Sequence, residues 1–156
     1  MSHDRPRISD DVNLEAVVRA LIEACRRGHA EVIEFTVGPR ASTPAQPRVG
    51  QEWLVEFAEP PRAPGVFVQV LDDTLQQLCP RYRARRRAFD MPLPHVLELP
   101  VGTFYRWIRE RALAGGCDTV PRLTDDRTVA DALLAIVAAR TRYPLIAVGA
   151  DPDRSA

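Results

Sequence analysis

The chain has 156 residues, the usual size of a single domain, of which 46% are hydrophobic and 27% are charged. Its 21 basic and 21 acidic residues cancel to a formal net charge of zero, and this balance argues against a nucleic-acid partner. All 21 basic residues are arginine, so mechanisms that use a lysine as an amine nucleophile or a Schiff base are excluded.

The sequence also argues against a membrane partner and a metal site. The longest apolar run, residues 132–139, is too short to cross a bilayer, and the polar residues 1–11 contain no stretch typical of a secretory signal. We therefore expect a cytoplasmic protein. The three cysteines (Cys25, Cys79 and Cys117) are widely spaced and form no Cys-x-x-Cys pair, so neither a metal site nor a disulfide framework is predicted.

The first half of the chain predicts a helix, two strands and a second helix. Apolar residues at helical spacing indicate an amphipathic helix that ends at Gly28; they are Leu14, Val17, Val18, Leu21, Ile22 and Cys25. Residues 30–37 and 51–57 predict strands, joined by a proline-containing surface loop over residues 38–50. A second helix follows, with Phe67, Val70, Leu71, Leu75 and Leu78 on its buried face.

The second half predicts a short strand and two more helices. The strand covers residues 95–99, and Thr103 suits the N-cap of a third helix that ends at Gly115. Residues 124–126 would cap a fourth helix, whose buried face is Val129, Leu133, Ile136 and Val137. Residues 145–148 allow a last short strand.

This order predicts an α+β fold, in which four helices pack on a small mixed or antiparallel sheet of three to four strands. We expect one domain over residues 12–148, a disordered start over residues 1–11 and a disordered tail over residues 149–156.

Several short motifs occur in a characteristic order. A Pro-x-Gly-Thr-Phe step begins at Pro100, and Val120-Pro121-Arg122 follows the third predicted helix. Glu34-Phe35-Thr36, the aromatic strand 51–57 and Tyr82-Arg83 precede them. With these motifs the chain resembles, over residues 12–137, the C-terminal domain of the auxin-responsive Gretchen Hagen-type acyl acid amido synthetases. The large domain of that family is absent from the sequence.

The resemblance implies a role in ATP-dependent amide formation. In this family ATP activates a carboxylic acid as an acyl adenylate, an amino acid displaces AMP, and the C-terminal domain swings over the active site between the two steps. By resemblance, Cys117, Asp118, Thr119 and Arg122 belong to a loop that faces the cleft. Family members carry lysines at two positions, which are Val12 and Thr119 in this sequence.

We therefore expect a stand-alone swinging domain that is catalytically silent by itself. Its status as an enzyme is left open, because it would depend on a second domain. It would act in trans with a separately encoded adenylating domain, or be a decayed remnant of a ligase. ATP and Mg²⁺ would be used only through that large domain, and the chain alone would need no cofactor. The alternative is a small non-catalytic protein-interaction or regulatory module.

Other polar clusters have both a functional and a structural interpretation. Arg122 would approach a phosphate, or would hold the loop after the third helix by a hydrogen bond. The arginine cluster of residues 81–87 would contact nucleic acid, or would form a solvated face paired with acidic neighbours, which we favour. We assign the pair Asp72-Asp73 to helix solubility, and no histidine has a catalytic partner at motif spacing.

Overall fold

A computed structural model describes residues 7–45, 49–116, 119–140 and 147–149. Its sheet has four strands in the order β1-β2-β3-β4: β1 (Glu31–Pro39), β2 (Gln51–Glu59), β3 (His95–Leu99) and β4 (Ala147–Val148). Strands β1 and β2 are antiparallel, β3 runs parallel to β2, and β4 runs antiparallel to β3. The predicted α+β class and mixed sheet are confirmed.

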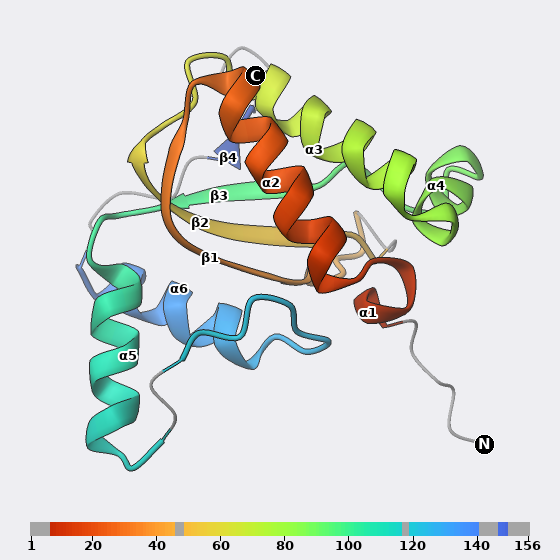
Figure 1. The fold of residues 1–156 in the computed structure, drawn as a ribbon. Helices are drawn as coiled ribbons and strands as arrows, with labels where there is room; N and C mark the ends of the chain where they lie inside the picture. The colour runs from red at the N-terminus through yellow and green to blue at the C-terminus, as the bar shows by residue number, and fades with distance from the viewer. Residues whose placement is uncertain (1–6, 46–48, 117–118, 141–146, 150–156) are drawn as a thin grey trace, which may run out of the picture.

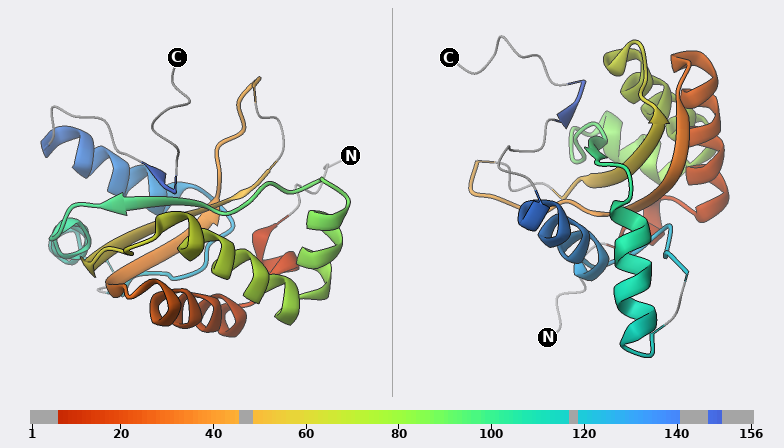
Figure 2. Two further views of the ribbon diagram at one scale, coloured as in Figure 1. Left: turned by 90° about the horizontal axis from the view of Figure 1, so that it is seen from above. Right: turned by 90° about the vertical axis from the view of Figure 1, so that its left-hand side faces the viewer.

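Helices cover both faces of this sheet (Figure 1). On one face lie α2 (Leu14–Gly28) and α3 (Pro64–Leu78), and on the other lie α5 (Thr103–Leu113) and α6 (Thr128–Arg140). Two shorter helices, α1 (Ile8–Asp11) and α4 (Pro80–Arg87), flank the first layer, so the described residues form six helices and not the four that we predicted. The two views of Figure 2 show the same three layers from above and from the side.

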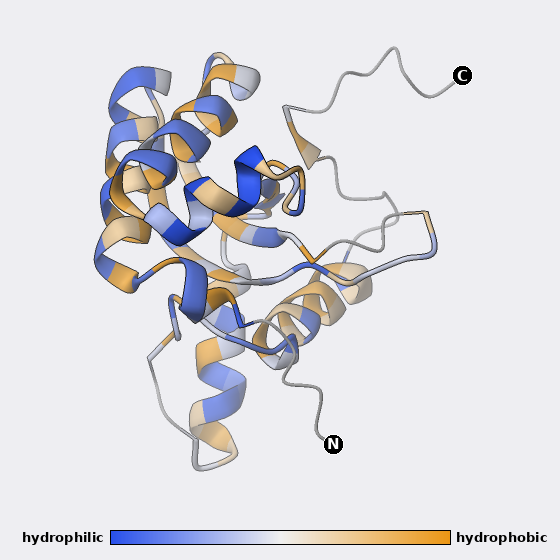
Figure 3. Ribbon diagram, turned by 90° about the vertical axis from the view of Figure 1, so that its right-hand side faces the viewer, coloured by the Kyte–Doolittle hydropathy of each residue, from blue (hydrophilic) through white to orange (hydrophobic). Residues whose placement is uncertain are grey.

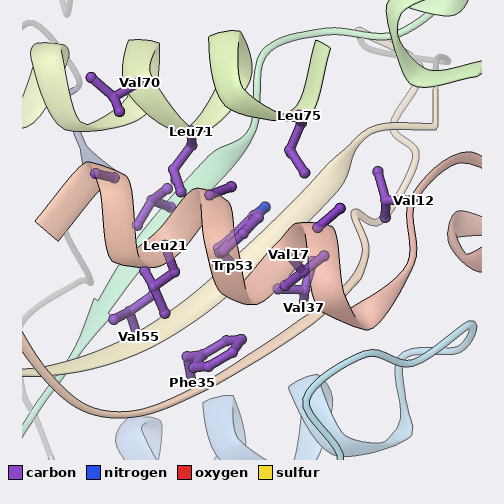
Figure 4. Close-up of a cluster of buried hydrophobic side chains, with 14 of the residues drawn as sticks. Val12, Val17, Leu21, Phe35, Val37, Trp53, Val55, Val70, Leu71 and Leu75 are labelled. Carbon is purple, nitrogen blue, oxygen red and sulfur yellow. The ribbon is translucent and has the colours of Figure 1, made fainter. Parts of the chain in front are cut away.

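The core is split into two clusters by strand β2. Trp53 and Val55 of β2 pack beneath α2 and α3 (Figure 4), with Leu21 and Leu71 from the helices. Leu54 points to the opposite face and packs with residues of α5 and α6. Because β2 is covered on both faces, every residue from 51 to 57 is buried.

Helix α2 buries only part of the stripe that the sequence predicts, with Val17 and Leu21 buried as expected. Leu14 and Ile22 are 48% and 61% exposed, whereas the helix buries Ala16, Val17, Ala20, Leu21, Ala24 and Gly28. A Cβ atom at Gly28 would lie 3.4 Å from Cδ2 of Phe67, so small residues allow α2 to approach α3 closely. Gly28 is the last helical residue, and His29, with φ of 53°, adopts the left-handed conformation that caps the helix.

The boundaries of the predicted elements differ in four places. Within the start that we expected to be disordered, residues 8–11 form α1, and Ile8 is buried. Helix α5 has Gly102 as its N-cap and begins at Thr103, and α6 begins at Thr128, whose N–H donates to Asp126. Of the predicted strand 145–148, the structure shows only β4, and residues 145 and 146 lie outside the described part.

In the described part of the chain, no helix combines the length and apolar character that a membrane span requires. Helix α6 comes nearest in composition, since hydrophobic residues surround most of its circumference (Figure 3). Its 13 residues are fewer than the roughly 20 that a transmembrane helix needs.

Candidate functional site

The chain after α5 returns to the outer edge of β1, where it adds a short parallel pairing to the sheet. The backbone N–H of Val37 donates to the carbonyl of Arg122 at 3.0 Å, and Thr124 N–H donates to the carbonyl of Val37 at 2.9 Å. The hydroxyl of Thr36 donates to the carbonyl of Pro121 at 2.7 Å. These three bonds hold residues 121–124 along β1, and we call residues 121–124 the edge segment.

The residues before the edge segment connect it to the second core cluster. Val120 is buried in that cluster, beneath α5 and α6. Thr119 is exposed, while Cys117 and Asp118 lie outside the described residues. Of the four residues predicted to face a cleft, the structure therefore describes Thr119 and Arg122. Thr119 precedes the buried Val120, and Arg122 follows it.

Arg122 makes structural contacts with β1 and keeps part of its guanidinium in solvent. Its Nε lies 3.4 Å from Oε1 of Glu34, and its guanidinium carbon lies 5.6 Å from the ring centroid of Phe35. The Phe35 ring in turn stacks on Trp53, with centroids 6.2 Å apart. These contacts agree with the structural interpretation of Arg122, although its side chain is still 51% exposed.

The two positions that the resemblance matches to lysines, 12 and 119, have opposite environments. Val12 is 3% exposed and belongs to the core cluster under α2 and α3 (Figure 4). Thr119 is on the surface. A lysine at position 12 would place its ammonium in an apolar region at considerable cost, whereas position 119 accommodates a charged side chain.

The Pro-x-Gly-Thr-Phe motif forms the turn that starts α5. Gly102 has a φ of 94°, which only glycine adopts without strain, and the Thr103 hydroxyl donates to the carbonyl of Pro100 at 2.6 Å. The N–H of Phe104 donates to Oε1 of Glu56 on β2 at 3.1 Å. The buried Glu56 carboxylate thus caps the positive end of α5, a partner that sequence reasoning missed because it lies 48 residues away.

A second buried carboxylate of β2, Glu52, binds two basic side chains. Its Oε2 lies 3.3 Å from Nδ1 of His95, and its Oε1 accepts from Nη1 of Arg127 at 3.2 Å. Burial alone would raise the pKa of Glu52, but the hydrogen bond from His95 and the charge of Arg127 outweigh it and lower the pKa. His95 therefore has a carboxylate partner on the neighbouring strand, and the residues around His95 in the sequence do not reveal this partner.

The arginine cluster of residues 81–87 lies in helix α4, and two of its five arginines pair with acidic residues of the described part of the chain. Arg85 contacts the buried Asp11 at 2.5 Å, and Arg86 contacts Asp72 at 2.8 Å. Asp72 is 1% exposed and also accepts from the hydroxyl of Tyr82 at 2.6 Å. The expected pairing with acidic neighbours holds for Arg85 and Arg86, but the assignment of Asp72 to helix solubility is wrong, because the α3–α4 contact buries it.

The remaining chemistry-bearing groups do not converge. Among the described residues, no cluster of His, Cys, Asp and Glu could hold a metal ion. Cys79 is buried and Cys25 half-buried, and burial raises the pKa of both thiols, which lowers their reactivity. His29 caps α2, and His3 lies outside the described residues.

Comparison with solved structures identifies two similar chains. The first is "GH3.15 acyl acid amido synthetase", with a TM-score of 0.61 and 15% sequence identity over 85% of this chain and 24% of that chain. The second is "AtGH3.15 acyl acid amido synthetase in complex with 2,4-DB", with a TM-score of 0.58 and 15% identity over 94% of this chain and 26% of that chain. This chain thus spans about a quarter of their length, and at this identity the likeness shows a shared fold.

No protein with a curated description matches the sequence. The family model described as the GH3 family C-terminal domain matches residues 13–127, which include β1, β2, β3, α5 and the edge segment. This match covers most of the chain, and the chain therefore belongs to the GH3 family, as an example of its C-terminal domain.

Proposed function

We propose that this chain acts as the swinging C-terminal domain in ATP-dependent amide synthesis, together with an adenylating domain that lies outside this sequence. The observation that carries the proposal is the edge segment, which the GH3 C-terminal fold anchors on β1 with Thr119 exposed beside it. In this role the domain covers an acyl adenylate while an amino acid displaces AMP. Because the first step consumes ATP, the proposal places the domain in the cytoplasm.

The domain alone should be catalytically silent. Stabilising the negative charge that develops on phosphate requires a fixed cation in a partly dry cleft. Position 12 is apolar and buried, position 119 is a threonine, and Arg122 shares its charge with Glu34. ATP, Mg²⁺ and the acyl acid would be held by the adenylating domain.

Two measurements test this function. The purified domain is assayed for pyrophosphate release with ATP, Mg²⁺ and a panel of carboxylic acid and amino acid pairs, and we expect none above a boiled control. The domain is then mixed with the adenylating domain of a GH3 acyl acid amido synthetase cut at the hinge, and we expect amide product that neither part forms alone. Protein-dependent pyrophosphate release by the domain alone would contradict the proposal that the adenylating domain carries out the ATP-dependent step.

The Thr119→Lys variant tests whether the residue just before the edge segment faces the reacting groups in the mixture. A lysine there adds a cation where the resemblance places the phosphates, so amide turnover in the assembled complex should rise about tenfold or more. Gln77→Lys is the matched control, because residue 77 is exposed on α3 in the opposite helix layer. An equal effect of both variants would mean that position 119 does not face the reacting groups.

The alternative is a non-catalytic interaction module that retains the family fold. The apolar burial of Val12 and the threonine at position 119 favour it, since both family cations are missing. A complex that assembles with the adenylating domain but forms no amide, with or without Thr119→Lys, would replace the catalytic proposal with this one.

A further inference from the structure

Helix α2 carries a second row of apolar side chains on its outer side. Leu14 and Ile22 are 48% and 61% exposed, although both are large and aliphatic. Val18 and Cys25 continue the same spacing of three or four residues and are only partly buried. Residues at this spacing share one face of a helix. We call Leu14, Val18, Ile22 and Cys25 the outer stripe.

The outer stripe faces away from α3. Ala16 and Arg19, on another side of α2, line a hollow together with Leu78 of α3. Figure 1 and Figure 2 show α3 along that side of α2 and no described helix of the same layer along the other side. The adjacent edge of β1 is also open, since no described backbone hydrogen bond joins residues 31–35 to a strand on that side. The described part of the chain therefore leaves the outer stripe largely uncovered.

A row of charged side chains borders the outer stripe on the flank nearer α3. In chain order it consists of Glu15, Arg19, Glu23 and Arg26, so that acid and base alternate along the helix. Glu23 and Arg26 form an exposed ion pair at 2.6 Å, a kind of contact that contributes little and can exchange partners. Because the row begins with an acid and ends with a base, it is complementary to the same row running in the opposite direction.

We propose that the outer stripe is the contact of a homodimer, in which α2 of a second copy packs antiparallel against it. A twofold axis brings the same surface of two copies together, so a single apolar stripe supplies both sides of the contact. An alignment centred near residue 20 sets Val18 against Ile22 of the second copy, and Ile22 against Val18 of the second copy. The dimer goes beyond the function proposed above and does not depend on it.

The charged row selects the second copy and its direction. In the antiparallel alignment Glu15 lies near Arg26 of the second copy, and Arg19 lies near Glu23 of the second copy, each pair occurring twice. A parallel alignment would instead place each charge beside its own like, which is unfavourable. Antiparallel packing also sets the charged flank of one helix against the charged flank of the other, so the flanks nearer β1 meet on the opposite side.

The contact is small, and we therefore expect a weak dimer. Helix α2 has 15 residues and is about 22 Å long at a rise of 1.5 Å per residue. A contact of one helix face lies at the low end of specific interfaces, so the dissociation constant should be on the order of 10–100 μM. Sedimentation equilibrium of the purified domain, at concentrations on both sides of this range, should show the mass rising from monomer to dimer.

Two matched variants test whether the outer stripe forms the contact. Ile22→Glu places a charge at the centre of the stripe and should leave the protein monomeric up to about 500 μM. Leu113→Glu is the control, because Leu113 is 81% exposed on α5, and it should leave the dissociation constant unchanged. Both substitutions alter exposed residues, so the urea midpoint of the dilute monomer should match that of the parent.

Charge reversal tests the antiparallel direction. Glu15→Arg sets like charges near each other at two symmetric places and should weaken the dimer about fivefold. Combining it with Arg26→Glu restores opposite charges at both places and should recover most of the affinity. A protein that stays monomeric at about 500 μM, a dimer that survives Ile22→Glu, or a double variant that dimerises no better than Glu15→Arg would each overturn the proposal.

Discussion

Removing the charge of Asp72 should be among the most damaging polar substitutions in this domain. The Asp72 carboxylate is 1% exposed and accepts hydrogen bonds from Tyr82, Gln76 and Arg86, at 2.6, 2.8 and 2.8 Å. A second nitrogen of Arg86 lies 3.2 Å from its other oxygen. Together these bonds hold α4 against α3, so Asp72→Asn perturbs the contact between two helices.

The expected cost follows from what the substitution leaves behind. Removing one partner of a buried ion pair typically costs about 3–5 kcal/mol, because the remaining charge is buried without compensation. The Arg86 side chain is 19% exposed and regains some hydration, which favours the lower end, about 3 kcal/mol. For a domain stabilised by about 5–15 kcal/mol this is a large fraction of the total.

Urea unfolding followed by circular dichroism measures this loss. With an m value of about 2 kcal/mol/M, a loss of about 3 kcal/mol lowers the midpoint by about 1.5 M. The control is Asp73→Asn on the same helix, because Asp73 is exposed and accepts a hydrogen bond from Gln69 at 2.9 Å. This substitution should change stability by less than about 0.5 kcal/mol. Adding Arg86→Met to Asp72→Asn should recover part of the loss, since no unpaired charge is then buried. Equal midpoints for Asp72→Asn and Asp73→Asn would refute the reasoning.

Three further predictions concern the core and the buried ionisable groups. Leu71→Ala should cost about 2–5 kcal/mol by cavity formation, whereas Leu78→Ala, at a residue 37% exposed, should cost far less; denaturant midpoints compare them, and similar losses would mean that the core is assigned wrongly. The pKa of Glu52 is lowered in the folded state, so its contribution to stability is complete above its unfolded pKa of about 4.3 and is lost as the pH falls through the folded value. The urea midpoint of Glu52→Gln should therefore approach that of the parent on acidification. A constant difference between the two midpoints would contradict this. Burial and the bond to Asp72 raise the pKa of Tyr82, so stability should fall as the pH rises above about 10. Absorbance at 295 nm should show Tyr82 ionising only when the domain unfolds. A Tyr82→Phe variant whose absorbance curve through unfolding is unchanged would argue against this.

Local sequence patterns are sufficient to locate most of the helices and strands. Helical spacing located α2, α3, α5 and α6, and the β-branched and aromatic runs located β1, β2 and β3. The motifs around Pro100 and Val120 pointed to the GH3 C-terminal domain, which the family match over residues 13–127 confirms. These signals can be detected in a single sequence because each depends on neighbours within a few residues.

Features that depend on contacts between distant segments emerge only in the folded chain. Helix α4 was missed because its residues are mostly arginine, and its one buried side chain, Tyr82, finds its partner on α3. Leu14 and Ile22 of α2 were wrongly assigned to its buried face, because close packing against α3 selects small residues there. Glu56 caps α5 and Glu52 orients His95 across separations of 48 and 43 residues. Charge and hydropathy along the chain do not encode such pairs, because burial and partners are set only when the sheet is covered on both faces.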